Sequence, residues 1–219
     1  MSRSHFPELG FLCETKNQAC NVEQKLKATG FSNWFIVDPD GVAGGMVLAW
    51  REGVTVQVVQ SDQFFIAERI TDQGLNERWG LIGVHLNTNE QVRSLQFSQL
   101  QLVIQQFGGK VVVTGDFNAI TSQAEKLGGI AKSASSIAAF RNFIDDGTLV
   151  DIGMVGRPFT WTNRRRGDDL VQERLDRVLV GTDWLSLYAN SVVLRLSELG
   201  SDHAPLLIDS NPRPGNSKQ

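Results

Sequence analysis

Lys110-Val-Val-Val-Thr114 runs directly into Gly115-Asp116-Phe117-Asn118, and this junction indicates the architecture of the chain. The short apolar run predicts a buried strand, and the polar and glycine residues after it are typical of a turn. A similar junction lies near the C-terminus, where Ser201-Asp202-His203 precedes Ala204-Pro-Leu-Leu-Ile208. Ligands gather at the ends of a scaffold's strands, so both junctions are candidates for one site.

Short strands predominate on both sides of the first junction. Residues 90–107 repeat apolar side chains every three or four positions, which predicts an amphipathic helix that ends at Gly108-Gly109. Further helices are expected at Ser136–Asp145, with Ser136 as its cap, at Val22–Ala28, and briefly after Thr182. Strands are expected at Leu9–Cys13, Trp34–Val37, Met46–Trp50, Val54–Val59, Phe64–Ile70, Trp79–Leu86, Lys110–Thr114, Phe159–Thr162, Leu175–Val180, Val192–Leu196 and Pro205–Ile208. This mixture predicts an α+β fold of two packed sheets with helices outside.

Size and composition are those of an ordinary globular protein. The chain has 219 residues, 41% of them hydrophobic and 21% charged, which suits a single domain. We expect an N-terminal extension over residues 1–9, a domain over 10–210, and a disordered tail over 211–219, which is rich in Pro, Gly, Ser and Asn. The cysteines, Cys13 and Cys20, are expected to be reduced thiols.

Charge and hydropathy narrow the classes of function. No apolar stretch approaches the roughly 18 residues of a membrane span, and the N-terminus lacks a secretory pattern, so we expect an intracellular protein, nuclear or cytoplasmic. The net charge of −3 argues against indiscriminate nucleic-acid binding. It does not exclude a nuclease, because a site built from carboxylates makes the total acidic. The segment Arg164-Arg165-Arg166 is either a positive rim or a solvated loop.

Polar residues at strand ends could carry chemistry, although each has an ordinary structural explanation. Glu14 could be a surface charge, and Asp116–Asn118 a simple turn. Asp202-His203 could be a loop pair, and Asp176, within Glu173–Arg177, a salt-bridged strand end. Together they are what metal-assisted attack on a phosphate ester requires. Hard oxygen ligands hold Mg²⁺, while polar groups orient water and meet the charge that builds on phosphorus.

Ordered motifs also resemble those of the endonuclease/exonuclease/phosphatase superfamily, which contains DNase I and the apurinic/apyrimidinic endonucleases. The motifs are Phe11–Lys16, Gly115–Asn118, Phe159–Asn163, Glu173–Arg177 and Ser201–His203. Glu125–Gly129 and the whole stretch from Phe159 to Arg177 look like plant LINE-type retrotransposon endonuclease domains. The resemblance covers about Gly10 to Asp209. It implies a four-layer α/β/β/α sandwich with its active site along one edge.

The resemblance also implies a role for each matching residue. Glu14 would be a ligand of Mg²⁺, with Mn²⁺ as an alternative, and Asp202 would lie beside the metal. Asp116 would orient or deprotonate the attacking water, and Asn118 would donate a hydrogen bond to the phosphate. The reaction would be in-line hydrolysis of a phosphodiester, leaving a 3′-hydroxyl and a 5′-phosphate.

His203 would contact the scissile phosphate and stabilise its added negative charge. Asp176 would accept a hydrogen bond from His203, which fixes the tautomer of the ring and favours its protonated form. Further substrate-binding groups are expected at Asn163, Arg164, Arg166 and His85.

The chain departs from the family pattern in two places. Family members open with a strand that carries an Asn of the metal site, followed by a helix, and only Met1–Glu8 precede the strand of Glu14. We therefore expect the family's first strand and helix to be lacking, which would leave a sheet region uncovered, lower the stability and favour self-association. The second departure is His85, near a position where a Tyr is usual. This histidine is either a substitute donor or a surface residue.

Three functions remain open on the sequence alone. The first is a Mg²⁺-dependent DNA endonuclease of retrotransposon type, which the Arg164–Arg166 segment favours because contacts along a phosphate backbone need several cations. The second is a phosphatase that acts on inositol phosphates, lipids or nucleotides. The third is a catalytically inactive retroelement remnant or a nucleic-acid-binding protein.

Overall fold

A six-stranded sheet forms the centre of the molecule. The computed structural model describes residues 6–41, 44–198 and 200–212. The strand order is β4-β5-β6-β7-β12-β9, and all neighbours are antiparallel except β6 and β7. The strands are β4 (Thr55–Asp62), β5 (Phe65–Asp72), β6 (Glu77–His85), β7 (Val111–Asp116), β9 (Leu149–Asp151) and β12 (Asp176–Gly181).

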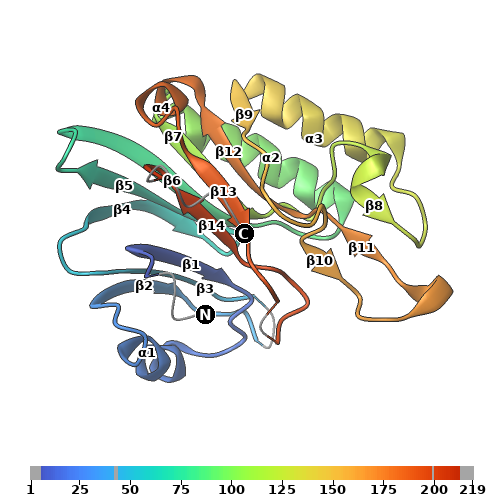
Figure 1. The fold of residues 1–219 in the computed structure, drawn as a ribbon, viewed down its shortest axis with the longest axis horizontal. Helices are drawn as coiled ribbons and strands as arrows, with labels where there is room; N and C mark the ends of the chain where they lie inside the picture. Colours follow the sequence, from blue (N-terminus) through green and yellow to red (C-terminus); the bar gives the residue numbers. More distant parts are fainter. Residues whose placement is uncertain (1–5, 42–43, 199, 213–219) are drawn as a thin grey trace.

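A second layer of strands packs against one face of this sheet. It consists of a three-stranded sheet in the order β1-β3-β2 and a two-stranded sheet of β13 and β14. A third, small sheet in the order β10-β11-β8 lies at the end of the molecule (Figure 1). The bounds are β1 (Leu9–Cys13), β2 (Asn33–Val37), β3 (Met46–Trp50), β8 (Lys126–Leu127), β10 (Trp161–Thr162), β11 (Gln172–Glu173), β13 (Val192–Arg195) and β14 (Leu206–Asp209).

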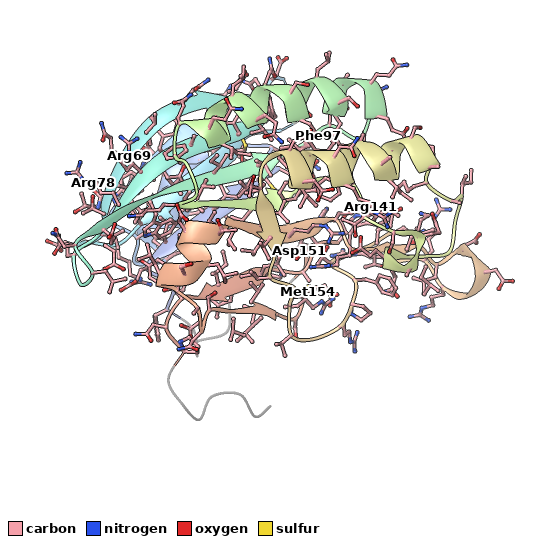
Figure 2. The ribbon with its side chains drawn as sticks, turned by 90° about the horizontal axis from the view of Figure 1, so that it is seen from above. Arg69, Arg78, Phe97, Arg141, Asp151 and Met154 are labelled. Atoms are coloured by element: carbon pink, nitrogen blue, oxygen red, sulfur yellow. The ribbon has the colours of Figure 1, made fainter. Side chains whose placement is uncertain are left out.

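Helices cover the outer faces of both layers. Figure 1 shows α2 (Glu90–Gln105) and α3 (Ala134–Asp146) beyond the six-stranded sheet, and α1 (Ala19–Lys27) on the opposite side, beyond β1-β3-β2. Figure 2 shows α2 and α3 side by side, with Phe97 labelled where they meet. The short α4 (Thr182–Leu187) follows β12. The predicted four-layer α/β/β/α fold is confirmed.

The two faces of the central sheet differ in what they bury. Val111 and Val113 of β7 pack with the α2 and α3 side chains, whereas Val112 packs in the core between the sheets with Met46 and Leu48 of β3. Alternation along β7 therefore directs every second residue at the second layer. Asp116 continues the parity of Val112, so its side chain lies on the face between the sheets, at the strand's end.

Two local predictions about the helices were wrong. Ser133, not Ser136, caps α3, because its hydroxyl accepts a hydrogen bond from the Ser136 backbone N–H. In α2 the predicted apolar face is correct only in the C-terminal half: Val92 and Leu95 are 41% and 69% exposed.

The first half of α2 instead buries Arg93 and Phe97. Phe97 stacks on Phe140 and Phe143 of α3 at centroid distances of 5.6 and 4.7 Å. Arg93 donates to the carbonyls of the loop before the helix and to the Ser136 hydroxyl. A guanidinium whose N–H groups are hydrogen-bonded can thus be buried where the sequence pattern predicted an apolar side chain.

Two further predictions concern the ends of the chain and the membrane. The tail predicted over 211–219 lies, from residue 213 onward, outside the described residues. In the part of the chain that the structure describes, no helix is both long and apolar enough to cross a membrane.

Candidate active site

Three neighbouring strands place a row of titratable side chains at one end of the central sheet. In the register of the sheet, Asp116 at the end of β7 lies beside His85 of β6 and Asp176 of β12. These residues share a face because strand neighbours in register point the same way. The row therefore faces the second layer, at the open end of the sandwich.

The row depends on one close approach of backbones. Gly115 has φ 131°, and a Cβ atom there would lie 2.1 Å from the carbonyl oxygen of Val84. Any side chain at this position would push β6 and β7 apart. The glycine in the Gly-Asp-Phe-Asn motif is thus what keeps His85 beside Asp116.

The second layer supplies Glu14, Asp202 and His203. Glu14 follows β1, and a Cβ at Gly83 of β6 would lie 2.4 Å from the Phe11 ring, so the glycine lets β1 pack closely on β6. The Glu14 Oε1 atom lies 3.7 Å from His85 Nε2, and its Oε2 lies 3.0 Å from Lys16 Nζ. Asp202 and His203 precede β14.

One open pocket of about 660 Å³ collects these groups. Asp176 does not line this pocket, but it contacts His203, which does.

The backbone is strained around the pocket: Glu14, Asn118 and Arg164 have φ values of 53°, 50° and 57°. Left-handed backbone at non-glycine residues costs about 1–3 kcal/mol each and clusters at functional sites. The predicted residues on the wall are Glu14, His85, Asp116, Asn118, Asp202 and His203.

Asp116 is the buried centre of the site. Its Oδ1 accepts from the Asn118 backbone N–H at 2.8 Å, and its Oδ2 accepts from Asn118 Nδ2 at 2.9 Å. The Nε2 atoms of His85 and His203 each lie 3.9 Å from Asp116 Oδ2. Burial, together with the charge of Asp176, raises the pKa of Asp116 to about 7. A carboxylate with such a pKa can take up a proton near neutral pH.

The two histidines at the site are driven in opposite directions. Burial alone would lower the pKa of His203, but its hydrogen bond to Asp176 and the charges of Asp176, Asp116 and Asp202 outweigh this and raise it to about 9. His203 Nδ1 lies 2.9 Å from Asp176 Oδ2, the contact predicted from the sequence. Burial lowers the pKa of His85, against the charge of Glu14. His203 is thus cationic and His85 neutral at pH 7.

The oxygen atoms at the mouth of the pocket fit a hard divalent cation. Glu14 and Asp202 line the pocket beside the buried Asp116, and Asp176 lies behind His203. Among the described residues, no three His, Cys, Asp or Glu side chains form a ready metal cluster. Mg²⁺ is usually bound in proteins by one or two carboxylates and keeps several waters.

The predicted substrate-binding residues fall into two groups. Arg164 and Arg166 are exposed on the loop after β10, outside the pocket wall, although Arg164 is near enough to help lower the pKa of Asp202. Asn163 is turned into this loop. Its Oδ1 accepts from the Arg165 and Val171 backbone N–H groups, and its Nδ2 donates to the Asp169 carbonyl. These bonds shape the loop and use one of the two N–H groups of Nδ2, so donation by the other to a phosphate stays a prediction.

Sequence reasoning assigned no role to three residues around the pocket. Trp161 lines it and donates from Nε1 to Asp202 Oδ2 at 3.0 Å, and Lys132 lines it and pairs with Glu173 at 3.1 Å. Thr160 is fully buried behind it. Trp161 and Thr160 lie inside the Phe-Thr-Trp-Thr-Asn motif, so position in that motif was the available signal.

Comparison with known sequences identifies the family. A sequence model of the Endonuclease/Exonuclease/phosphatase family matches residues 3–203. The chain belongs to this family. A comparison with curated proteins found no match. The family is in keeping with the pocket, since its members hydrolyse ester bonds of phosphate and are generally dependent on divalent metals.

Solved structures of family enzymes share the fold at low sequence identity. An AP endonuclease from Archaeoglobus fulgidus superposes with a TM-score of 0.68 at 16% identity, covering 93% of this chain and 88% of that one. The 3′ phosphatase NExo (D146N) from Neisseria, bound to product DNA hairpin, gives 0.66 at 20% identity, with 93% and 88% covered. The endonuclease domain of TRAS1, a telomere-specific non-LTR retrotransposon, gives 0.63 at 15% identity, with 80% and 76% covered.

Proposed function

We propose that this protein is a Mg²⁺-dependent phosphodiester hydrolase that nicks DNA, an endonuclease of the retrotransposon type. One observation carries the proposal. In one open pocket, His203 is held by Asp176 and lies 3.9 Å from Asp116; His203 is cationic, and Asp116 has a pKa of about 7. Hydrolysis of a phosphodiester requires both a proton acceptor for the attacking water and a cationic donor for the phosphate oxygens.

Each side chain has a distinct part in the proposed reaction. Asp116 orients the attacking water and accepts its proton, since its raised pKa lies near the working pH. His203 donates from Nε2 to a phosphate oxygen and meets the charge that develops there. Asn118 holds both oxygens of Asp116, and its Nδ2 also donates to the Leu86 carbonyl, so one of these two Nδ2 bonds is released when it donates to the phosphate.

Glu14 and Asp202 are the residues that would hold the cation, Mg²⁺ or alternatively Mn²⁺. When bound, such an ion neutralises phosphate charge and makes a coordinated water more acidic. Asp202 uses one carboxylate oxygen for Trp161 Nε1, and within the described residues its Oδ1 has no hydrogen-bond partner. Glu14 Oε1 faces His85 across a gap of 3.7 Å, so each residue has an oxygen to offer.

DNA is the proposed substrate because positive groups extend beyond the pocket. Arg164 and Arg166 are exposed on a loop that starts from the pocket wall, where a duplex backbone would pass over them. His85 lies on the wall, 3.7 Å from Glu14, and we propose that it contacts the phosphate there. The Neisseria NExo structure, which shares this fold, was solved with a DNA hairpin, and this supports the choice over a small phosphate ester.

A nicking assay tests the proposal. Purified protein is incubated with supercoiled plasmid in Mg²⁺ or in EDTA, alongside Asp116→Ala and His203→Ala. We expect Mg²⁺-dependent nicks that both variants lack. Equal nicking by wild type and variants would indicate a contaminant, and no nicking by a folded wild type would leave a catalytically inactive, nucleic-acid-binding protein. Phosphate release from inositol phosphates without nicking would point to the phosphatase.

We further propose that the protein self-associates through its second layer. Among the described residues β1 pairs only with β3, and β14 pairs only with β13, so each presents an unpaired edge. Leu12 of β1 is 46% exposed. Unprotected edges of this kind promote pairing between chains. Light scattering after size-exclusion chromatography should find oligomers that Leu12→Lys reduces, and a monomer at all concentrations would refute this.

A further inference from the structure

His203 and Asp176 reach their contact from two different sheets. Asp176 begins β12 of the central sheet, whereas His203 precedes β14, which in the described chain is paired only with β13. Neither strand ladder therefore fixes the Nδ1–Oδ2 distance of 2.9 Å. The segment Thr160–Thr162, which contains β10, bridges the two sides.

Thr160 ties the backbones on both sides of this contact together. Its Oγ1 accepts from the Asp176 and Leu175 backbone N–H groups at 2.9 and 3.0 Å. Its carbonyl accepts from the Ala204 N–H at 2.7 Å, one residue after His203. Thr160 is fully buried, so loss of the hydroxyl would leave two N–H groups without a partner.

Trp161 and Thr162 hold Asp202 at two points. The Trp161 indole donates to Asp202 Oδ2 at 3.0 Å, and the Thr162 N–H donates to the Asp202 carbonyl at 3.0 Å. Trp161 also forms a β-bridge with His203. With one carboxylate oxygen fixed by the indole and the backbone fixed by β10, the rotation of the Asp202 carboxylate is restricted.

The same segment carries the basic loop. Thr162 Oγ1 accepts from the Arg164 N–H at 3.2 Å, and the Asn163 amide closes the loop that follows. The backbone of Arg164 is therefore connected to His203 through Thr162 and Trp161. This short strand therefore sets the position of the basic loop relative to His203 and Asp176.

We propose that Thr160 and Trp161 are positioning residues of the active site: the Thr160 hydroxyl places Asp176 against His203, and the Trp161 indole N–H orients Asp202. This inference rests on the proposed phosphodiester hydrolysis. Positioning predicts an effect on kcat rather than on KM, because misplaced groups weaken stabilisation of the transition state more than binding of the ground state. A purely structural role predicts loss of stability alone.

Matched variants separate these roles. Thr160→Val keeps the shape and removes the hydroxyl, Thr160→Ser restores the hydroxyl, and Trp161→Phe removes the indole N–H while keeping an aromatic ring. Thr55→Val, on exposed β4, is the control for loss of a threonine hydroxyl. We measure kcat and KM on supercoiled plasmid with Mg²⁺. In metal-free protein we also follow the proton resonance of the His203 Nδ1–H group by NMR.

We expect Thr160→Val and Trp161→Phe to lower kcat by about 10- to 100-fold with KM little changed, while Thr160→Ser and Thr55→Val stay close to wild type. The His203 resonance should shift or broaden in Thr160→Val and not in Thr160→Ser. Normal kcat and an unshifted resonance in Thr160→Val, or a fall in thermal stability alone for Trp161→Phe, would overturn the inference.

The test can be decided even if one variant is unstable or the wild type is inactive. If Thr160→Val fails to fold, Trp161→Phe and Thr160→Ser still decide the outcome. If the wild type nicks no DNA, the proposed function fails, and the His203 resonance in the threonine variants alone supports or overturns the positioning role.

Discussion

Replacement of Glu68 by glutamine should change how the stability of this protein depends on pH. Glu68 lies in β5 and is 0% exposed, with the same parity as Ile66 and Ile70, which pack between the sheets. Among the described residues neither of its carboxylate oxygens has a hydrogen-bond partner. Burial raises the pKa of Glu68 well above its usual value of 4.5. The folded protein therefore keeps this proton at a pH where the unfolded chain has lost it.

The sign of the effect follows from proton counts. Above pH 4.5 the unfolded state ionises Glu68 and the folded state does not, so the free energy of unfolding falls as pH rises. The slope is about 1.4 kcal/mol per pH unit, within a window that opens at the unfolded value and closes at the folded pKa. Glu68→Gln cannot ionise and removes this slope. Its stability relative to wild type should therefore rise with pH above 4.5, by at most about 1.4 kcal/mol per pH unit, until the folded pKa of Glu68 is reached.

Urea unfolding, followed by tryptophan fluorescence at several pH values, measures the difference. Glu52→Gln, at an exposed position, is the matched control and should run parallel to wild type. If the Glu68→Gln curve also runs parallel to wild type across this range, then Glu68 is ionised in the folded protein. The conclusion that Glu68 is buried between the sheets as an uncharged group without a hydrogen-bond partner would then be wrong.

Three further variants test the site and its support. Asp176→Asn should lower the pKa of His203 from about 9, measured by NMR in metal-free protein, and an unchanged value would contradict the role of their hydrogen bond. Combined Arg164→Gln and Arg166→Gln should weaken DNA binding and make the log–log salt dependence shallower by about 1.8, and an unchanged slope would exclude phosphate contacts. Arg177→Met should cost about 3 kcal/mol of unfolding free energy, because it removes a fully buried guanidinium and leaves the half-buried Glu125 and Asp151 with Arg174 alone; a loss below about 1 kcal/mol would show that the ion pairs are dispensable.

The sequence predicted the positions of helices and strands better than it predicted which of their residues are buried. The strand before Gly115 and the helix ending near Gly108 follow from periodicity and from glycine, which act locally. The burial of Arg93 in place of Val92 could not be predicted, because it depends on carbonyls and a hydroxyl brought in by the preceding loop and by α3. The hydrogen bonds of the Asn163 side chain could not be predicted for the same reason: its partners belong to a turn that forms only in the folded loop.

The sequence alone determined which chemical groups this protein can use. Residue types and their order supplied the carboxylates, the imidazole of His203 and the family pattern, since these are properties of the chain itself. Only the tertiary structure decided where these groups lie relative to one another and which of them are protonated. Register across β6, β7 and β12 set His85 and Asp176 on either side of Asp116. Burial raises the pKa of Asp116 to near neutrality, and the neighbouring carboxylates keep His203 cationic against its own burial, because pKa values depend on charges and solvent exposure that the folded chain brings together.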